Sequence, residues 1–256
     1  GAPADTAARL ARATVPVLCY HQIREPTGND SAAYVTSPEQ LDAHLTAIAD
    51  AGYTTVTAGQ YADHVLRGTV LPPKPIVLTF DDASEGHYSE ALPILQRHGM
   101  TATFFVMTVV LGNEGWMTRD QVAETSAAGI EIGSHSWDHQ AVTKLTTAAD
   151  FRTQFRQPRT TLEEITGKPV TTFAYPFGIT TPRVIGPLQK AGYTSAFQLA
   201  EPANARAPMF SIRRVAVGTI APDALMRLIR DDFPNAPGGD GSGASTTTAP
   251  AGTTAS

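Results

Sequence analysis

The chain has 256 residues, of which 42% are hydrophobic and 17% are charged, and its formal net charge is -5. This composition excludes a wholly disordered chain and is enough to bury a core in one large α/β domain or two small ones. Lys and Arg are scattered along the sequence rather than gathered into a basic stripe, which argues against nucleic acid as a partner. Because no run of about 18 apolar residues occurs, we expect no membrane span.

Composition divides the chain into three parts. Residues 1–13 are Ala-rich and are expected to be a lead-in segment, residues 14–236 the folded domain, and residues 237–256 a disordered tail. The tail is mostly Gly, Thr, Ala and Ser, and it has no aliphatic side chain larger than Ala to pack on a core. The sequence shows no signal-peptide pattern and begins at Gly1, as either a trimmed or a processed chain would.

Short β-branched or aromatic runs alternate with amphipathic stretches in the folded domain. The strands are expected at residues 15–20, 54–56, 76–80, 101–107, 130–132, 171–175, 193–197 and 212–217. The first helix is well marked: Ser37 caps it, Pro38 suits its first turn, Gln40 completes a capping box, and Gly52 ends it. Later helices are expected to end at Gly99, Gly129, Gly167 and Gly192.

Strands separated by helices imply right-handed parallel crossovers, and hence either an open doubly wound sheet or a barrel. Seven or eight such units favour the barrel. In a barrel of this type the catalytic residues lie on loops that follow the carboxyl ends of the strands. Motifs that directly follow a predicted strand are therefore candidates for the active site.

Two adjacent aspartates, Asp81 and Asp82, end the apolar run at 75–80. Two charges at the end of a buried strand require partners. Both can serve one site only where the chain is leaving the strand, because neighbouring side chains on a strand point to opposite faces. The alternative is a helix N-cap for a segment beginning near Ser89, or a solvated turn.

Two histidines, His135 and His139, follow the predicted strand at 130–132. Residues four apart meet on one side of a helical turn, which would present two imidazoles to one metal ion, although such a pair can also be a surface loop. With Asp82 they would make a three-ligand site with open positions, the pattern of a catalytic metal.

Two further motifs follow predicted strands. The segment at 173–178 contains Tyr175, Pro176 and Phe177, where Phe177 could expose its ring and its amide, but an ordinary strand-to-helix turn is an equal alternative. His21 follows the first strand, where a lone histidine is more often structural. Elsewhere, Trp116 and Trp137, like Tyr175, could stack on sugar rings or could be packing.

The remaining chemically active side chains are expected to be structural. Cys19 lies in the apolar run at 15–20 and, as a single cysteine, cannot form an intramolecular disulfide, so we expect buried packing. The other four histidines lie on predicted helices or their margins and are expected to be solvated. They are His44, His64, His87 and His98.

Three of these motifs read Thr-Phe-Asp-Asp at 79–82, His-Ser-Trp-Asp-His at 135–139 and Tyr-Pro-Phe-Gly at 175–178. Together they resemble the polysaccharide deacetylases of carbohydrate esterase family 4, the NodB homology domain. The resemblance covers residues 15 to 217 and makes residues 14–236 the catalytic domain. It implies a distorted (β/α)7-8 barrel.

The resemblance also implies roles for the site residues. Asp81 would be the general base, while Asp82, His135 and His139 would bind a divalent metal, most commonly Zn²⁺, with Co²⁺ or Ni²⁺ as substitutes. The motif at 175–178 would line the groove, and the amide of Phe177 would bind the oxyanion.

Two departures from the family pattern bear on the site. Most members have Arg where Ala174 stands, and most have a late His that serves as general acid, which is missing here. The opening segment 15–21 looks like the exopolysaccharide deacetylase branch, whose strand order is circularly permuted and in which the early His, here His21, takes the place of the acid. By the same logic Arg213 or Arg214 would replace the missing Arg.

The expected function is therefore metal-dependent removal of N-acetyl groups from an N-acetylglucosamine-containing polysaccharide, such as an exopolysaccharide, peptidoglycan or a chitin-like polymer. The alternatives are an O-acetyl xylan esterase of the same family and a catalytically inactive carbohydrate-binding domain. The partner would be the acetylated glycan, the chain a monomer, and the location extracellular or cell-wall associated, because such polymers lie outside the membrane.

Overall fold

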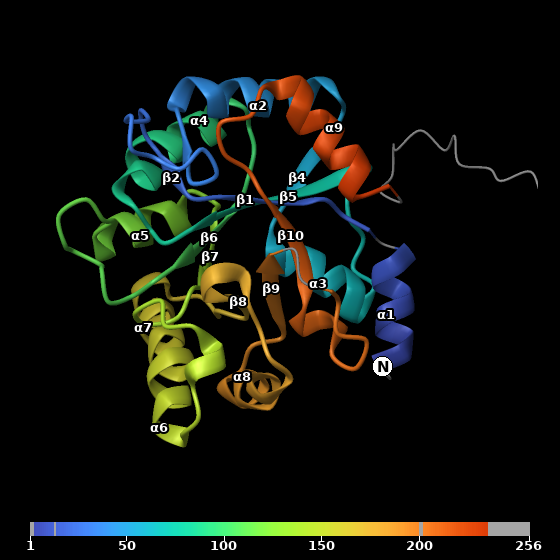
Figure 1. The fold of residues 1–256 in the computed structure, drawn as a ribbon, viewed down its shortest axis with the longest axis vertical. Helices are drawn as coiled ribbons and strands as arrows, with labels where there is room; N and C mark the ends of the chain where they lie inside the picture. Colours follow the sequence, from blue (N-terminus) through green and yellow to red (C-terminus); the bar gives the residue numbers. More distant parts are fainter. Residues whose placement is uncertain (1–2, 13, 200–201, 235–256) are drawn as a thin grey trace, which may run out of the picture.

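The computed structural model describes residues 3–12, 14–199 and 202–234. A parallel β-sheet lies at the centre of the molecule, with helices around it (Figure 1). The strands of this sheet are β1 (Val17–Tyr20), β4 (Thr54–Val56), β5 (Pro75–Asp81), β6 (Thr103–Val106), β7 (Glu131–Ser134), β8 (Thr172–Ala174), β9 (Ser195–Leu199) and β10 (Ile212–Ala216).

Helices connect most of these strands and return the chain to the start of the next one. The α-helices are α1 (Pro3–Arg12), α2 (Pro38–Asp50), α3 (Ala58–Arg67), α4 (Leu92–Arg97), α5 (Arg119–Ala127), α6 (Ala148–Phe151), α7 (Gln157–Thr166), α8 (Ile185–Ala191) and α9 (Pro222–Asp232). Short π-helical turns, η1 (His87–Ala91) and η3 (Arg152–Arg156), lead into α4 and α7, and short 3-10 turns lie in the loops at η2 (Val142–Lys144), η4 (Pro176–Gly178), η5 (Pro182–Val184) and η6 (Pro208–Phe210).

The sheet closes into a barrel. Seven strands follow one another in the order β1-β10-β9-β8-β7-β6-β5, and β1 pairs again with β5, where Leu18 lies opposite Leu78. β4 joins this ring by pairing with the first residues of β5. All of these pairs are parallel. The predicted distorted (β/α)7-8 barrel is confirmed.

The predicted strands all form, with ends that differ by no more than two residues. β5 is buried along its whole length because the barrel interior covers one of its faces and helices cover the other. Two short strands outside the barrel, β2 (Gln22–Ile23) and β3 (Val35–Thr36), were not predicted, since two residues are too few to show an alternating pattern.

The start of α2 follows the prediction only in part. The Ser37 hydroxyl accepts a hydrogen bond from the Gln40 amide at 3.1 Å, and Pro38 is the first helical residue. The capping box is wrong, because the Gln40 side chain donates instead to the carbonyl of Ile220 at 3.1 Å. Packing of α2 beside α9 brings that carbonyl within reach and overrides the local pairing.

His44 is buried rather than solvated, which corrects the prediction for this residue. Its Nε2 donates to the Ile220 carbonyl at 2.7 Å, and its Nδ1 accepts from the Tyr20 hydroxyl at 3.2 Å. Burial lowers the pKa of His44, so the ring is neutral and serves as a polar link between α2 and the barrel. His64 and His98 are partly exposed and hydrogen-bonded, so their predicted solvation holds only in part.

The structure describes most of the predicted N-terminal lead-in but not the predicted C-terminal tail. α1 occupies most of the predicted lead-in, and Leu10 from this helix packs on the barrel core. The predicted tail at 237–256 lies outside the described residues. Among the described helices, none combines the length and apolar composition that crossing a bilayer requires.

Glu131, the first residue of β7, should make stability depend on pH. Its carboxylate accepts hydrogen bonds from the Gly59 amide and the Thr172 hydroxyl, both at 2.8 Å. Burial raises the pKa of Glu131, although these hydrogen bonds oppose the rise. A group whose folded-state pKa is raised stabilises the fold below its unfolded-state pKa, and this contribution is lost as pH rises through the folded-state value.

We therefore expect Glu131→Gln to gain stability relative to the unsubstituted chain as pH rises from about 4 to about 7. Urea unfolding of both proteins at several pH values within this range measures the difference in the free energy of unfolding. A difference that does not change with pH would show that burial has no net effect on this carboxyl.

Candidate active site

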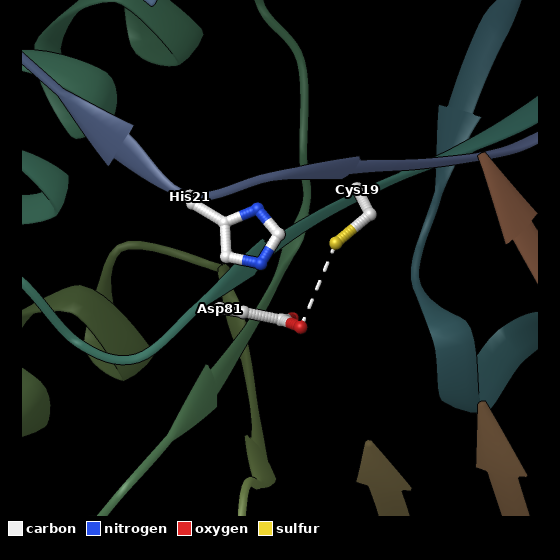
Figure 2. Close-up of side chains that lie close together, drawn as sticks. All are labelled: Cys19, His21 and Asp81. Carbon is white, nitrogen blue, oxygen red and sulfur yellow. Dashed lines mark hydrogen bonds between the residues drawn. The ribbon is translucent and has the colours of Figure 1, made fainter. Parts of the chain in front are cut away.

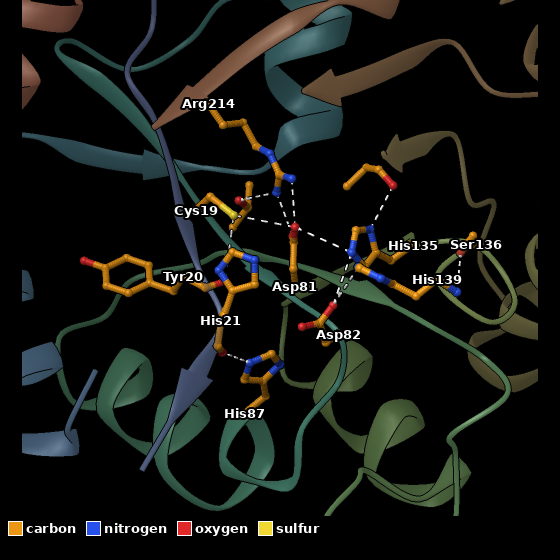
Figure 3. Close-up of polar contacts among 12 residues, drawn as sticks. Cys19, Tyr20, His21, Asp81, Asp82, His87, His135, Ser136, His139 and Arg214 are labelled. Atoms are coloured by element: carbon orange, nitrogen blue, oxygen red, sulfur yellow. Dashed lines mark hydrogen bonds and ion pairs between the residues drawn. The ribbon is translucent and has the colours of Figure 1, made fainter. Parts of the chain in front are cut away.

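The adjacent aspartates lie at the carboxyl end of β5, as predicted. Asp81 is the last residue of the strand, and the backbone then turns sharply, with φ of 89° at Asp82 and 70° at Ala83. Non-glycine residues rarely adopt such left-handed angles, and they cluster at functional sites. The next helical turn, η1, has no side-chain cap, so the alternative N-cap role is wrong. The turn lets both carboxylates face one site (Figure 3).

The two histidines lie on the loop after β7, but not on a helical turn. Ser136 and His139 have φ of 68° and 64°, and the Ser136 hydroxyl accepts a hydrogen bond from the His139 amide at 3.0 Å. Gln154 holds the middle of this loop, since its side chain accepts from the Trp137 amide and donates to Asp138. The predicted pairing of the two imidazoles is therefore achieved by a strained, hydrogen-bonded loop.

Asp82, His135 and His139 come together as predicted. The Asp82 Oδ1 atom lies 3.2 Å from His135 Nε2 and 3.6 Å from His139 Nε2. One potential ligand atom from each residue lies within 4.8 Å of the other two. Asp82 and His139 are partly exposed while His135 is buried, so the group is open to solvent on one side.

The hydrogen bonding of His135 is compatible with a cation at this group. Its Nδ1 lies 2.8 Å from the Ala174 carbonyl, which can only accept, so Nδ1 carries the hydrogen. In the neutral ring, Nε2 then points a lone pair at Asp82 Oδ1, an atom for which no donor in the described chain has hydrogen-bonding geometry. Two facing acceptors repel each other unless a positive charge lies between them.

Electrostatic attraction between the histidine and the two aspartates also shifts their pKa values. Burial alone would lower the pKa of His135, but the negative charges of Asp81 and Asp82 outweigh burial and raise it. Burial would raise the pKa of Asp82, but its contact with His135 outweighs burial and lowers it. Two imidazole nitrogens and one carboxylate oxygen suit Zn²⁺, Co²⁺ or Ni²⁺, so the residues present fit the expected metal.

Asp81 is held by a buried arginine. Arg214 Nη1 donates to Asp81 Oδ1 at 2.6 Å, and Nη2 donates to Oδ2 at 2.8 Å, a bidentate pair in which both side chains are almost fully buried. Burial alone would raise the pKa of Asp81, but the guanidinium outweighs burial and holds the pKa well below its usual range. Asp81 is therefore ionised and fixed in orientation.

Of the two arginines that the sequence offered, Arg214 fills the place of the missing family Arg. Arg213 lies on the other face of β10, where it is exposed, donates to the Asp232 carbonyl and lies 3.4 Å from its carboxylate. Neighbouring residues of a strand point to opposite faces, so only one of the two can face the barrel interior. The prediction of Arg213 as the orienting residue is wrong.

His21 lies at the end of β1, and its ring is directed at Asp81 (Figure 2). Burial lowers the pKa of His21, with Asp81 and Asp82 opposing this. Its backbone carbonyl accepts a hydrogen bond from His87 Nε2. His87 is fully buried between the rings of Phe80 and Phe104, so the prediction that it is solvated is wrong.

Cys19 is buried, as predicted, but it also lies at the site. Its thiol is directed at Asp81 Oδ2 over 3.5 Å. Alternation along β1 contained a signal for this position, because Cys19 and His21 are two residues apart and therefore share a face of the strand. The apolar run around Cys19 favoured simple packing and hid that signal.

In the motif at 175–178, the side chain of Phe177 is exposed and those of Tyr175 and Pro176 are buried. Phe177 is 59% exposed, has φ of 62°, and its ring centroid lies 4.5 Å from that of His139. Tyr175 is fully buried and donates through its hydroxyl to the Phe210 carbonyl, and Pro176 is also buried. Sugar stacking by Tyr175 and direct substrate contact by Pro176 are therefore wrong, since both side chains pack inside.

The two tryptophans remain open to solvent in part. Trp116 and Trp137 are both half-buried, and residue 116 forms an isolated bridge with Ser84, two residues after Asp82. Stacking of either ring on a sugar stays a prediction.

Comparison with known proteins identifies the class of protein. The family model for polysaccharide deacetylases matches residues 69–196, half of the chain, so the chain belongs to this family. In Bacillus subtilis, YxkH, whose name assigns it provisionally to the polysaccharide deacetylases, is 27% identical over 206 residues, which cover 80% of this chain and 72% of YxkH.

Two further relatives extend the comparison. The poly-beta-1,6-N-acetyl-D-glucosamine N-deacetylase of Staphylococcus aureus is 23% identical over 73% of this chain and 72% of its own. The structure of the Streptococcus pyogenes deacetylase PplD, in complex with acetate, has the same fold, with a TM-score of 0.76 and 22% identity over 84% of this chain and 97% of that chain. The barrel, the family and a deacetylase activity of the hydrolase class are thus consistent with one another.

Proposed function

We propose that this chain hydrolyses N-acetyl groups of an N-acetylglucosamine-containing polysaccharide with a divalent metal held by Asp82, His135 and His139. The observation that carries the proposal is the arrangement of two carboxylates with separate environments on one turn. Asp82 faces two imidazoles, whereas Asp81 is paired with Arg214 and lies beside them. One carboxylate is thus suited to a cation and the other to a proton.

A divalent cation held at this site would lower the pKa of a water molecule from about 15.7 toward about 7. Asp81 is ionised and can take the proton of the attacking water. Arg214 keeps both oxygens of Asp81 in place during this transfer, since rotation of the carboxylate would break two charge-assisted hydrogen bonds.

Two other groups act on the acetamide. The amide of Phe177, at the turn beside His139, donates to the oxyanion that develops as the carbonyl is attacked. His21, on the opposite side of Asp81 from His135, gives a proton to the departing amine (Figure 3). Burial lowers the pKa of His21, while the negative charges of Asp81 and Asp82 oppose this and favour the protonated ring that donates.

The expected outcome of His21→Ala is retention of the metal with a loss of turnover on the order of 100-fold to 1,000-fold. Metal content by elemental analysis and the rate of acetate release, measured on the same preparation, check this. Unchanged turnover would assign the general acid to another residue.

The function is tested by acetate release from a panel of acetylated glycans, with the protein as purified, after chelator, and after zinc or cobalt is added back. We expect release from poly-N-acetylglucosamine, peptidoglycan or chitooligosaccharides that is lost with chelator and restored by metal. Release from acetylxylan alone would instead indicate an O-acetyl esterase. Binding without metal-dependent release would indicate a carbohydrate-binding domain.

Because the proposed substrates lie outside the membrane, we also propose an extracellular or cell-wall location.

A further inference from the structure

A second group of potential metal ligands lies beside the first. Cys19 Sγ, a ring nitrogen of His21 and a carboxylate oxygen of Asp81 all lie within 4.8 Å of one another, and all three residues are buried. Figure 2 shows the thiol and the imidazole, both from β1, directed at the carboxylate at the end of β5. We propose that these residues form a second, weaker divalent-metal site, which fills only when metal is in excess and then stops hydrolysis.

The donor atoms favour a particular class of ion. One sulfur, one imidazole nitrogen and one carboxylate oxygen suit borderline and soft divalent ions such as Zn²⁺, Co²⁺ and Cd²⁺ rather than Mg²⁺ or Ca²⁺. The His21 side chain is only 9% exposed, and its Nδ1 has no hydrogen-bond partner within the described chain. The thiol lies 3.5 Å from Asp81 Oδ2 and makes a long contact of 3.9 Å with the Tyr20 carbonyl. The His21 nitrogen and the weakly bonded thiol are therefore available to bind an ion.

The surroundings explain why this site is the weaker of the two. Arg214 occupies both oxygens of Asp81, at 2.6 and 2.8 Å, so an incoming ion must share or displace that pair. The guanidinium also places a positive charge next to the ion. The metal must also displace the proton of the buried Cys19 thiol, which is released to solvent. The site at Asp82 has no arginine paired with its carboxylate and no thiol proton to displace, so it fills first.

Occupation of the second site would remove the reacting groups. The ion would take an oxygen of Asp81 and a nitrogen of His21, which are the base and the acid under the proposed function. The inhibitory part of the inference rests on that function, whereas metal binding by Cys19 does not.

Cobalt titration tests the binding directly, because Cys19 is the only cysteine among the 256 residues. Metal-free protein in thiol-free buffer is titrated with Co²⁺ and followed by absorption. The first equivalent should give visible cobalt bands without a sulfur-to-cobalt charge-transfer band. Further cobalt should add that near-ultraviolet band in the unsubstituted chain but not in Cys19→Ser, which should retain the first phase. Absence of the band from the unsubstituted chain at every excess of cobalt would overturn the proposal.

Zinc inhibition tests the consequence. In excess Zn²⁺ the unsubstituted chain should lose most of the acetate release that it shows with one equivalent of Zn²⁺. Cys19→Ser and Cys19→Ala should each keep a larger fraction of their own one-equivalent rate, whatever that rate is. Equal inhibition of all three proteins would overturn the inhibitory role. A thiolate band in a protein that releases no acetate from any glycan would support the second site and contradict the proposed function instead.

Discussion

Asp82→Ala is expected to lose the metal and, with it, nearly all acetate release. The carboxylate is the only negatively charged ligand of the proposed site, and without it two imidazoles must hold a dication alone. Turnover should fall by at least the roughly 100-fold to 1,000-fold that removal of one oxyanion stabiliser costs. Elemental analysis of the purified variant should find close to no zinc, cobalt or nickel.

Thermal unfolding gives a second readout that does not depend on activity. A ligand at 100 times its Kd stabilises a protein by about 2.7 kcal/mol, so added zinc should raise the Tm of the unsubstituted chain. At zinc concentrations below those that fill the second site, it should not raise the Tm of Asp82→Ala. Asp50→Ala is a matched control, because Asp50 is exposed at the end of α2 and contacts none of the proposed ligands. An equal response to zinc in both variants would place the metal elsewhere.

Asp81→Asn should keep the metal but lose turnover by about 100-fold to 10,000-fold, the range expected when a general base is removed. The variant should also be less stable by about 3–5 kcal/mol, because Arg214 would be left as a buried charge without its counter-ion. Acetate release, metal content and urea unfolding measure the three expectations separately.

A double variant separates the catalytic effect from the structural one. Asp81→Asn combined with Arg214→Met removes the uncompensated charge, so we expect recovery of part of the lost stability without recovery of turnover. Turnover that recovered together with stability would show that Asp81 acts only through the fold.

Much of the barrel could be predicted because its strands are buried on both faces. The apolar run at 75–80 and its counterparts are continuous and end at helix signals, so each strand was located from a single sequence. The rule that barrel enzymes place their catalytic residues after strands then selected Asp81, Asp82, His135 and His21 from the other polar residues. These residues do lie at one edge of the barrel (Figure 3).

The errors arose where tertiary packing decides a residue's environment. His44 and His87 lie on helical segments and carry no local sign of burial, yet each donates to a backbone carbonyl that another segment brings to it. The left-handed backbone at Ser136 and His139 was likewise invisible, because non-glycine residues seldom adopt it. The choice of Arg214 over Arg213 required knowledge of which face of β10 meets the barrel interior.

The most direct test of the metal centre is a crystal structure of the chain grown with one equivalent of zinc, with anomalous diffraction measured at the zinc edge. We expect a single strong anomalous peak bonded to Asp82 Oδ1, His135 Nε2 and His139 Nε2, with Asp81 held by Arg214 beside it. A peak that touches fewer than two of these three residues, or no peak in a crystal of active enzyme, would contradict the assignment.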